Sequence, residues 1–388
     1  MTKFMDIQVE TFTMEKDFDT ALGTWRSFVE RNDVTCGFHC DPLVVSKGVR
    51  FSHEQGLVLV TVFGESNEII AILPFLRLRV PLPMQLGLWR LATITARQVF
   101  LSDYEFAVDN KITRSSILPS VLSALVEKQL GDIIVSPNCA VDEEEEFRER
   151  LRKHIPKLRI EKEQKTYLLD LPETFDEYLA GLRSKTRKNL RYQVRSFGRK
   201  TGREIFVRRY DKESQIGEFC EHIRSVWQKS WQGKLGMSPP PEVSSITGIA
   251  ARGWLRGYVL FADSAPVAYV AGYQYCRCYY YESIAYDPTW RDHSPGSVLN
   301  YLLLEDLFTT RRPDILDFGC GYNQYKEALG SRTENRAQLV MPIAPKTRLA
   351  LLIQRGLNRI HKMLKPLLLK AGIFKQLKRL AQSRNKQK

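Results

Sequence analysis

The sequence predicts an α/β (α+β) fold: two tandem units with mixed, mostly antiparallel sheets, followed by a basic helical segment. Its 388 residues suit two domains of about 100–200 residues each and an appendage. Short apolar runs of strand character alternate with longer segments of helical spacing, which indicates sheets covered by helices. Hydrophobic residues make up 43% and charged residues 26% of the chain. This balance excludes a disordered or collagen-like protein.

The chain carries no sequence mark of export or membrane insertion. No stretch reaches the roughly 18 apolar residues of a membrane-spanning helix, and residues 1–19 lack the basic and then apolar pattern of a signal peptide. The seven cysteines are an odd number, which argues against a disulfide framework. We therefore expect a cytoplasmic protein.

Residues 1–165 are expected to form the first unit. A loop rich in proline and leucine should separate its second strand from the apolar stretch at residues 88–96, since proline interrupts a strand ladder. The acidic run at residues 142–146 is interpreted as a solvated helix start, because consecutive carboxylates on a helix point in different directions. The expected helices and strands of this unit are 17–31, 57–63, 69–80, 117–129 and 132–136.

Residues 166–345 are expected to form the second unit. A basic segment of helical spacing, residues 185–200, follows its first short strand. Further along, three consecutive strand-like runs precede an amphipathic helix that begins at Ser297, and the last two runs are close enough for a hairpin. The other expected elements are strands 167–171 and 204–209, helix 214–231, strands 254–262, 265–275 and 278–286, and strand 313–318.

Residues 346–388 hold 13 lysines or arginines and no acidic residue, so they carry almost all of the net charge of +14. The nearly neutral remainder gives little support for a nucleic-acid-binding domain. Apolar residues at helical spacing predict two basic amphipathic helices with a break near Pro366 and Gly372. Such helices can lie on an anionic membrane surface, bind a membrane-bound synthase, or pack on the body of the protein. The apolar positions are Leu349, Ile353, Leu357, Ile360, Leu367, Ile373, Leu377 and Leu380.

The junction between the strand ending near Tyr286 and the helix from Ser297 is a candidate phosphate site. Backbone amides at a helix N-terminus bind pyrophosphate with the help of the helix dipole. Gly296 allows close approach of the backbone, and Arg291 can add a phosphate contact. The spacing Arg291-x-x-Ser294-x-Gly296 resembles the [Gln/Arg]-x-x-Gly-x-[Gly/Ala] loop that grips coenzyme A in GNAT acyltransferases, with Ser294 where glycine is usual. An ordinary helix-capping turn is the alternative.

Residues 315–330, ILDFGCGYNQYKEALG, predict a strand, a glycine turn and then Tyr325 and Lys326. The tripeptide from Asp317 matches a kinase motif, but the sequence has no kinase-type glycine-rich loop or HRD partner. The turn also resembles that of S-adenosylmethionine methyltransferases, although the segment before the basic tail is too short for the α/β domain which that fold requires. In an acyltransferase, Tyr325 or Lys326 could face the transfer centre.

The basic helix has two interpretations. Lys185, Arg187, Lys188 and Arg191 could bind an anionic substrate such as a phosphorylated sugar, a lipid carrier or a polysaccharide. They could also form a solvated face.

A cluster of potential zinc ligands begins at Cys36. Cys36, His39 and Cys40 lie close together in the sequence. A structural zinc site would need a further pair of ligands at matching spacing, and the sequence has none. No metal is therefore expected.

Four stretches in order resemble the CelD/BcsL-like acetyltransferases, a branch of the GNAT superfamily tied to exopolysaccharide and cellulose production. The resemblance covers most of residues 166–335 and, more loosely, FHCDPLVVSKG at 38–48. It implies two tandem GNAT-like domains with the acyl-CoA loop in the second. FemAB-like aminoacyl transferases share this architecture and the Tyr-x-Lys-type element, and are the close competitor. The stretches are LRSKTRKNLRYQVR (Leu182–Arg195), WQKSWQGKLG (Trp227–Gly236), SPGSVLNY (Ser294–Tyr301) and DFGCGYNQYK (Asp317–Lys326).

The resemblance implies transfer of an acyl group, expected to be acetyl, from acyl-CoA to a hydroxyl or amine of a sugar, a polysaccharide precursor or another envelope-related acceptor. Strand 279–286 would splay beside the pantetheine arm, and a backbone N–H there would polarise the thioester carbonyl. Trp227 joins the basic helix as a candidate for binding the acceptor. The pyrophosphate would be held by Arg291, Ser294, Gly296 and the amides of Ser297 and Val298.

Four side chains are candidates for the chemistry. Glu282 lies mid-strand among aromatic residues, where burial would raise its pKa toward that of a useful general base, unless it points to solvent. Asp317 is the alternative base. Tyr325 could protonate the departing thiolate, and Lys326 could stabilise charge.

Two other functions are open alternatives. An aminoacyl transferase would depend on charged tRNA, and its familiar members often insert a helical arm for which residues 211–250 are too short. A non-catalytic scaffold would bind a membrane-associated synthase through the basic tail and would not bind acyl-CoA.

Overall fold

A computed structural model of the protein describes residues 6–49, 51–52, 54–87, 89–140, 149, 151, 155 and 158–370. These residues form two compact units, one with the described residues up to 162 and from 337 onward, and the other with residues 163–336. The strands β8 (Arg159–Asp170) and β14 (Arg332–Pro342) each have residues in both units. The chain therefore returns to the first unit after completing the second. The acidic run at 142–146 lies outside the described residues.

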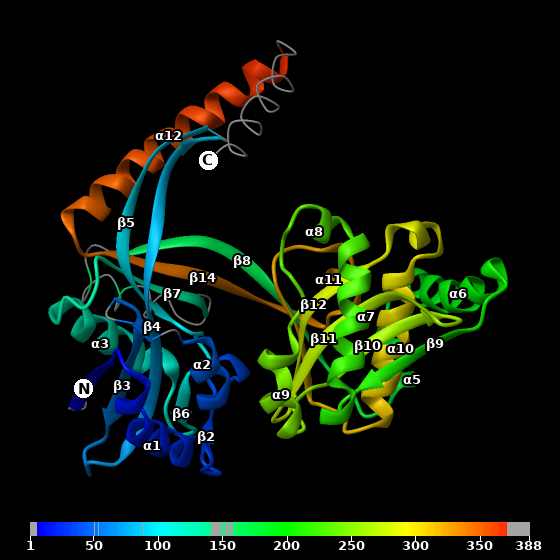
Figure 1. Ribbon diagram of the computed structural model, residues 1–388, viewed down its shortest axis with the longest axis horizontal. Helices are drawn as coiled ribbons and strands as arrows, with labels where there is room; N and C mark the ends of the chain where they lie inside the picture. Colours follow the sequence, from blue (N-terminus) through cyan, green and yellow to red (C-terminus); the bar gives the residue numbers. More distant parts are fainter. Residues whose placement is uncertain are drawn as a thin grey trace. The chain divides into compact units, whose positions relative to one another are not determined.

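The first unit is a mixed sheet with helices packed on it (Figure 1). Its sheet follows the order β1-β3-β4-β5-β7-β14, antiparallel from β1 to β5 and parallel between β5 and β7. Buried aliphatic side chains of β3 and α3 form its core. The elements are β1 (Asp6–Phe12), α1 (Asp19–Val29), β2 (Val34–Thr35), α2 (Pro42–Gly48), β3 (Gly56–Phe63), β4 (Ile69–Leu86), β5 (Trp89–Leu101), β6 (Ala107–Asp109), α3 (Arg114–Glu127), β7 (Ile133–Ala140) and α12 (Pro345–Lys370).

The expected loop after residue 80 is instead the outer half of a long β-hairpin. Strand β4 continues to Leu86 and pairs with β5 through Pro81 and Pro83, which face Thr95 and Thr93. Proline is tolerated on a strand edge that needs no N–H donor. Strand β3 pairs with β4 only as far as Arg77, so the outer half of β4 has such an edge. The prediction was wrong because it treated each proline as the end of a strand.

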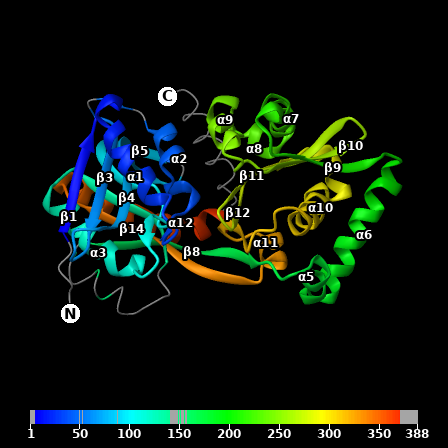
Figure 2. The ribbon, with the colours of Figure 1, turned by 90° about the horizontal axis from the view of Figure 1, so that it is seen from below.

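The second unit contains a sheet in the order β14-β8-β13-β12-β11-β10-β9. Strands β9 to β12 pair antiparallel, and β12 and β13 pair parallel. Figure 2 shows this sheet between α7 on one side and α10 on the other. The elements are α5 (Phe175–Gly181), α6 (Ser184–Thr201), β9 (Ile205–Tyr210), α7 (Ile216–Lys229), α8 (Trp231–Lys234), α9 (Val243–Ala251), β10 (Gly257–Ala262), β11 (Ala265–Tyr275), β12 (Cys278–Tyr286), the 3₁₀ helix η4 (Pro288–His293), α10 (Pro295–Thr309), β13 (Ile315–Cys320) and α11 (Gln324–Leu329).

Side chains of successive residues of β10 show which helix covers each face of this sheet. A Cβ at Gly257 would lie 2.3 Å from the ring of Phe219, so this face packs on α7. The next residue, Tyr258, donates a hydrogen bond to Asp306 of α10 over 2.7 Å on the other face. Successive strand residues point to opposite faces. Helices α7 and α10 therefore cover opposite sides of β10.

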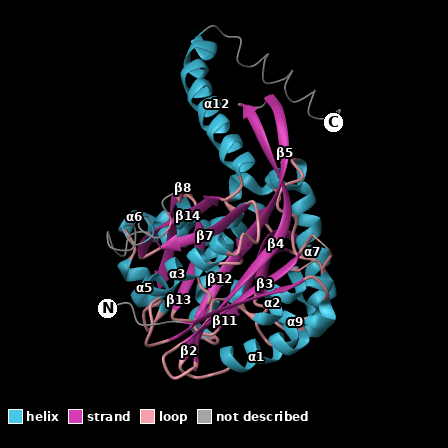
Figure 3. Cartoon of the chain, turned by 90° about the vertical axis from the view of Figure 1, so that its left-hand side faces the viewer, coloured by secondary structure: helices cyan, strands magenta, loops and turns pink. Residues whose placement is uncertain are grey.

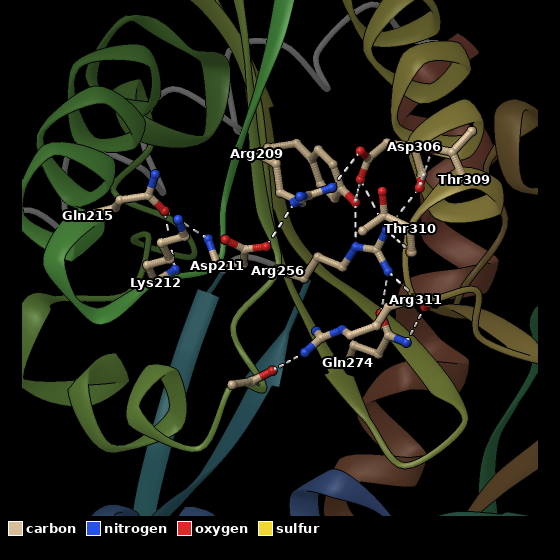
Figure 4. Close-up of polar contacts among 12 residues, drawn as sticks. Arg209, Asp211, Lys212, Gln215, Arg256, Gln274, Asp306, Thr309, Thr310 and Arg311 are labelled. Carbon is tan, nitrogen blue, oxygen red and sulfur yellow. Dashed lines mark hydrogen bonds and ion pairs between the residues drawn. The ribbon is translucent and has the colours of Figure 1, made fainter.

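The C-terminal end of α10 is fixed to the sheet by a buried arginine (Figure 4). Arg256 is 1% exposed. Its Nη2 donates to Oδ2 of Asp306 (3.0 Å) and to the carbonyl oxygens of Asp306 (3.0 Å) and Thr310 (2.7 Å), and its Nη1 donates to the carbonyl oxygen of Arg311 (3.1 Å). The last carbonyls of a helix have no intrahelical partner. Arg256, which directly precedes β10, supplies that partner to the Thr310 carbonyl.

Helix α12 lies along the β4–β5 hairpin (Figure 3). The side chain of Gln354 exchanges hydrogen bonds with the backbone of Gln85, over 2.7 Å and 3.0 Å. The break was expected near Pro366 and Gly372. The helix continues through Pro366 to Lys370, so it has no break at Pro366, and Gly372 lies outside the described residues. Proline removes one helical hydrogen bond and often bends a helix without ending it. The expected second helix, with Ile373, lies outside the described residues.

Among the residues with described positions, no helix has the length and apolar character needed to cross a membrane.

Candidate active site

The parallel ladder between β12 and β13 is short and ends in the middle of β12. Residues Cys278–Tyr280 pair with Ile315–Asp317, and the pairing stops there. A β-bulge follows at once, because Ala271 faces Ser283 while Gly272 faces Tyr281. Glu282 is the extra residue of this bulge. Bulges of this kind redirect side chains and end strand pairing, often beside active sites.

The four candidates for the chemistry come together beside this point. Lys326 lies half-buried on α11, with its Nζ 3.0 Å from the carbonyl oxygen of Cys320 and 3.3 Å from that of Gly319. Burial lowers the pKa of Lys326, and the nearby groups Cys320, Asp317 and Glu282 oppose this shift. The ammonium group therefore lies within electrostatic range of both candidate carboxylates.

The glycine turn at the end of β13 has the backbone that its sequence predicts. Gly319 and Gly321 have φ angles of +74° and +89°, which glycine adopts without steric cost. Oδ1 of Asp317 accepts the Gly319 N–H over 2.7 Å. One carboxylate oxygen of Asp317 thus accepts a hydrogen bond from the turn, and two carbonyl oxygens of the turn accept hydrogen bonds from Lys326.

Tyr325 forms part of a buried aromatic group. Its ring centroid lies 5.9 Å from that of Tyr281 and 6.0 Å from that of Phe318. The hydroxyl groups of Tyr325 and Tyr281 share a hydrogen bond, and Tyr281 donates to Oδ1 of Asn300 over 2.7 Å. Burial raises the pKa of Tyr325 well above its ordinary value. The phenol is therefore protonated and connected to α10 through Tyr281.

Glu282 does not have the buried environment that the sequence was thought to give it. Its neighbours Tyr280 and Tyr281 are buried, whereas Glu282 is exposed. The bulge places one extra residue in the strand and so breaks the alternation of inward and outward side chains. Of the two alternatives for Glu282, the structure shows the exposed one, and its role as a base stays a proposal.

The residues expected to hold the pyrophosphate all lie at the start of α10. Ser294 has φ +54° and ψ +50°, which is the left-handed conformation, and the helix begins at Pro295. Glycine adopts this conformation at no steric cost, whereas other residues incur strain. This geometry explains why glycine is usual at the Ser294 position of the motif.

Replacement of Ser294 tests this backbone requirement. Ser294→Gly should leave the free energy of unfolding unchanged or raise it by up to about 1 kcal/mol, since glycine removes the strain but gains freedom when unfolded. Ser294→Val should lower it by about 1–2 kcal/mol, because a β-branched side chain fits a positive φ poorly. Urea unfolding of both variants measures the difference. Equal stability of the two variants would contradict the assignment.

The amides of this turn are not all available to a ligand. The N–H groups of Ser297 and Val298 both donate to the carbonyl oxygen of Ser294, over 3.0 Å and 3.2 Å. The expectation that these two amides are free does not hold, because the first helical turn already uses them. Pro295 has no N–H, and no described residue accepts a hydrogen bond from the Gly296 amide. The Gly296 N–H is thus the available donor of this turn.

The basic helix packs next to this turn through its C-terminal half. Phe197 stacks on Trp290 of η4 with a centroid distance of 5.7 Å. Lys185, Lys188 and Arg191 are exposed. Arg187 has a structural role instead, since its Nη1 donates to the carbonyl oxygens of Leu179 (3.1 Å) and Ala180 (3.0 Å) at the end of α5.

Trp227 does not lie with the basic helix. It belongs to α7, on the opposite face of the sheet from α10, on which α6 packs. Its Nε1 donates to the carbonyl oxygen of Met237 over 3.1 Å, so it fixes the turn after α8. The grouping of Trp227 with α6 was wrong because helical spacing does not say which face of a sheet a helix covers.

One polar residue beside β12 escaped the sequence analysis. Gln232 of α8 donates from Nε2 to the carbonyl oxygen of Ile284 over 3.1 Å, beyond the end of the β12–β13 ladder. Its Oε1 is buried and has no hydrogen-bond partner among the described residues. A buried acceptor without a partner costs about 1–3 kcal/mol. Its position in WQKSWQGKLG was the only signal that could have singled it out.

Comparison with known proteins agrees with this arrangement. Residues 184–327 match the family of acetyltransferase (GNAT) domains. This match spans most of the second unit. The match covers the basic helix, the bulged strand β12, the turn before α10 and the segment with Tyr325 and Lys326. No curated protein matches the chain.

Two solved structures are similar in fold to most of this chain, across both units. A crystal structure of FemX has a TM-score of 0.57 at 12% identity and covers 89% of this chain and 100% of its own. The structure of L-PGS from Bacillus licheniformis has a TM-score of 0.52 at 10% identity and covers 86% of this chain and 96% of its own. Likeness at such identity concerns the fold alone. It confirms the expected α/β class.

No group of three or more His, Cys, Asp or Glu residues in the described part of the chain has a geometry that could hold a metal ion.

Proposed function

We propose that the GNAT domain transfers an acyl group, expected to be acetyl, from acyl-CoA to a hydroxyl or amine group. The observation that carries this proposal is the end of the β12–β13 ladder, where the glycine turn, Tyr325 and Lys326 lie beside a bulged strand. A strand that loses its neighbour exposes backbone donors and acceptors, and these can bind an extended ligand in place of a strand. The pantetheine arm of coenzyme A has amide groups suited to that role.

The start of α10 would hold the pyrophosphate. A Cβ added to Gly296 would meet no atom within 4 Å, so this backbone borders open space. The Gly296 amide has no partner among the described residues. Arg291 is exposed and pairs with no described carboxylate. An amide at a helix N-terminus and a nearby arginine are suited to a diphosphate.

The transfer itself would join a nucleophilic oxygen or nitrogen of the acceptor to the acyl carbon and release the thiolate of coenzyme A. Asp317 or Glu282 would take the proton of the nucleophile. The protonated phenol of Tyr325 would supply a proton to the thiolate, and the Lys326 ammonium would stabilise the charge that develops. Asn300 and Tyr281 orient Tyr325 through their hydrogen bonds.

The acceptor would lie on the α8 side of β12. The unpaired Oε1 of Gln232 is suited to a substrate N–H or O–H donor. The resemblance to CelD/BcsL-like acetyltransferases supports a sugar, a polysaccharide precursor or another envelope-related acceptor. The exposed Lys185, Lys188 and Arg191 are available to an anionic group of such a molecule.

Aminoacyl transfer from charged tRNA is the second candidate, and the likeness to FemX favours it. The resemblance to FemAB-like aminoacyl transferases points the same way. Residues 211–250 form the short helices α7 and α8 and most of α9. They hold no long helical arm of the kind that familiar aminoacyl transferases insert. This observation favours the acyl-CoA donor.

Calorimetric titration with acetyl-CoA tests the donor. We expect micromolar binding by the wild-type protein and at least tenfold weaker binding by the double variant Arg291→Ala/Gly296→Trp. The indole would occupy the open space beside the backbone amide. Gly296→Ala is the matched control, since a methyl group meets no atom there and should bind within about threefold of wild type.

Two outcomes would contradict the proposal. A folded wild-type protein that binds no acetyl-CoA would reject the donor, and turnover with charged tRNA would then assign the aminoacyl reaction. Unchanged binding by Arg291→Ala/Gly296→Trp would place the donor elsewhere. Circular dichroism of each variant shows whether the fold is retained.

A further inference from the structure

Helix α12 has three distinct sides. One side packs on the β4–β5 hairpin, through Ala350, Gln354 and His361. These positions are four and seven residues apart, which places them on one face of a helix. The other two sides bear different side chains and do not pack on the hairpin.

The second side is an apolar stripe that remains exposed. Leu349 is 60%, Ile353 42%, Ile360 46% and Met363 74% exposed. Their spacing of four, seven and three residues places them on one line along the helix. The apolar side chains that make the sequence of α12 amphipathic are therefore not the ones that pack on the hairpin. A contiguous exposed apolar surface of this kind usually marks an interaction site.

The third side is cationic. Arg348, Arg355, Arg359 and Lys362 recur at helical spacing along the flank of the stripe. None of them forms an ion pair with a described carboxylate. The hairpin below adds no negative charge, since residues 69–102 contain no aspartate or glutamate. The described residues of α12 and of the hairpin thus include cations and no carboxylate.

We propose that the stripe and cationic flank of α12 bind the surface of an anionic phospholipid bilayer, with the helix axis parallel to the membrane. The apolar side chains would enter the acyl boundary, and the arginines and lysine would contact the phosphate groups. This surface is called the α12 stripe below and consists of Leu349, Leu352, Ile353, Ile360 and Met363 with its cationic flank.

Charge complementarity favours a lipid surface over a second copy of the chain. Two α12 stripes that faced each other would bring their cationic flanks together, and neither flank has a carboxylate to offset the repulsion. An anionic bilayer supplies a continuous negative surface for every cation on the helix. It also accepts apolar side chains without a shaped pocket.

Vesicle co-sedimentation of the full chain tests this proposal. The probes are phosphatidylcholine vesicles with and without phosphatidylglycerol. We expect wild type to bind the phosphatidylglycerol vesicles and to bind pure phosphatidylcholine at least tenfold more weakly. Ile353→Glu/Ile360→Glu/Met363→Glu should lose at least tenfold in binding to the anionic vesicles. All three positions are exposed, so the fold should be unaffected.

A matched control separates the stripe from net charge. Met14→Glu/Leu235→Glu/Val243→Glu also replaces three exposed apolar side chains and changes the charge by the same amount, but at positions outside α12. It should bind within about threefold of wild type. Arg355→Gln/Arg359→Gln/Lys362→Gln should weaken binding at low salt and reduce the dependence of binding on salt.

Three outcomes would overturn the proposal. Wild type could fail to bind phosphatidylglycerol vesicles. The stripe variant could bind as well as the matched control, which would leave charge alone as the cause. Analytical ultracentrifugation could show a wild-type dimer that the stripe variant loses, which would assign the stripe to a second copy of the chain.

Discussion

Replacing Arg256 with methionine should lower the free energy of unfolding by about 3–5 kcal/mol, as expected when one member of a buried charged network is removed. The variant would remove one buried charged donor from the carboxylate of Asp306 and from three backbone carbonyls. The carboxylate would keep Tyr258 and Arg209 as donors, whereas the Thr310 carbonyl would keep no donor among the described residues. Methionine fills a similar volume, so the loss measures the polar network more than a cavity. Urea unfolding at neutral pH gives the value.

A surface arginine provides the control for this prediction. Arg203 pairs with Asp263 over 3.1 Å, and both side chains are about half exposed. Arg203→Met should cost less than about 1 kcal/mol, because solvent screens exposed pairs. If Arg256→Met and Arg203→Met were equally stable, the Arg256 network would not hold α10 to the sheet.

Because of this network, the free energy of unfolding should depend on pH in the acidic range. Burial alone would raise the pKa of Asp306, but hydrogen bonds from Tyr258, Arg209 and Arg256 hold it below its ordinary value. A carboxylate whose pKa is lowered by folding stabilises the protein above its unfolded pKa of about 4 and loses this contribution as pH falls through the folded value. Wild type should therefore lose more stability between about pH 5 and pH 2 than Arg256→Met does.

Removing Tyr325 or Lys326 should strongly reduce turnover if the proposed acyl transfer takes place at the end of the β12–β13 ladder. We expect Tyr325→Phe and Lys326→Met each to lower kcat by about 10²-fold or more, the usual size of a proton-transfer contribution. Donor binding should change little, because neither residue belongs to the turn before α10. Steady-state kinetics with acetyl-CoA, beside calorimetric titration, measures both quantities.

The dependence of turnover on pH tests whether Lys326 acts through its charge or only holds the glycine turn in place. Burial lowers the pKa of Lys326, and the ammonium form exists only below that pKa. If the cation is needed, turnover should fall as pH rises through the lowered value, earlier than for an exposed lysine near about 10.4. Lys326→Arg should shift this fall to higher pH. A structural role in holding the carbonyls of the glycine turn would leave the profile unchanged.

Tyr322 is the matched control for the tyrosine. It lies in the same segment but is 73% exposed, so Tyr322→Phe should turn over as wild type does. Turnover within about threefold of wild type in both Tyr325→Phe and Lys326→Met would remove these residues from the mechanism.

Local sequence features were enough to predict the elements that form the candidate site. The apolar alternation of β10 to β12, the glycine turn at Gly319 and the spacing around Gly296 each depend on neighbouring residues. Such features appear within a few positions of the chain. They predicted the strand–turn–helix order and the junction before α10. They also placed Asp317 and Lys326 in one segment.

The sequence did not predict which residues of neighbouring strands face each other. Glu282 is exposed because β11 pairs with β12 through a bulge, and the bulge depends on which residues of two strands face each other. The outer half of β4 accepts two prolines because β3 ends before them. In both cases the structure at one strand depends on how a neighbouring strand pairs with it. The residues of a single strand do not specify that pairing.

The sequence by itself determined the alternating elements, the nearly neutral body and the amphipathic, acid-free tail. Only the tertiary structure decided that Arg256 is buried, that Trp227 lies across the sheet from α6, and that α12 packs by a side other than its apolar stripe. Periodicity shows that a helix has an apolar face, but packing decides what that face meets. Burial is a property of all the segments that surround a residue, and for that reason it appears only when they are brought together.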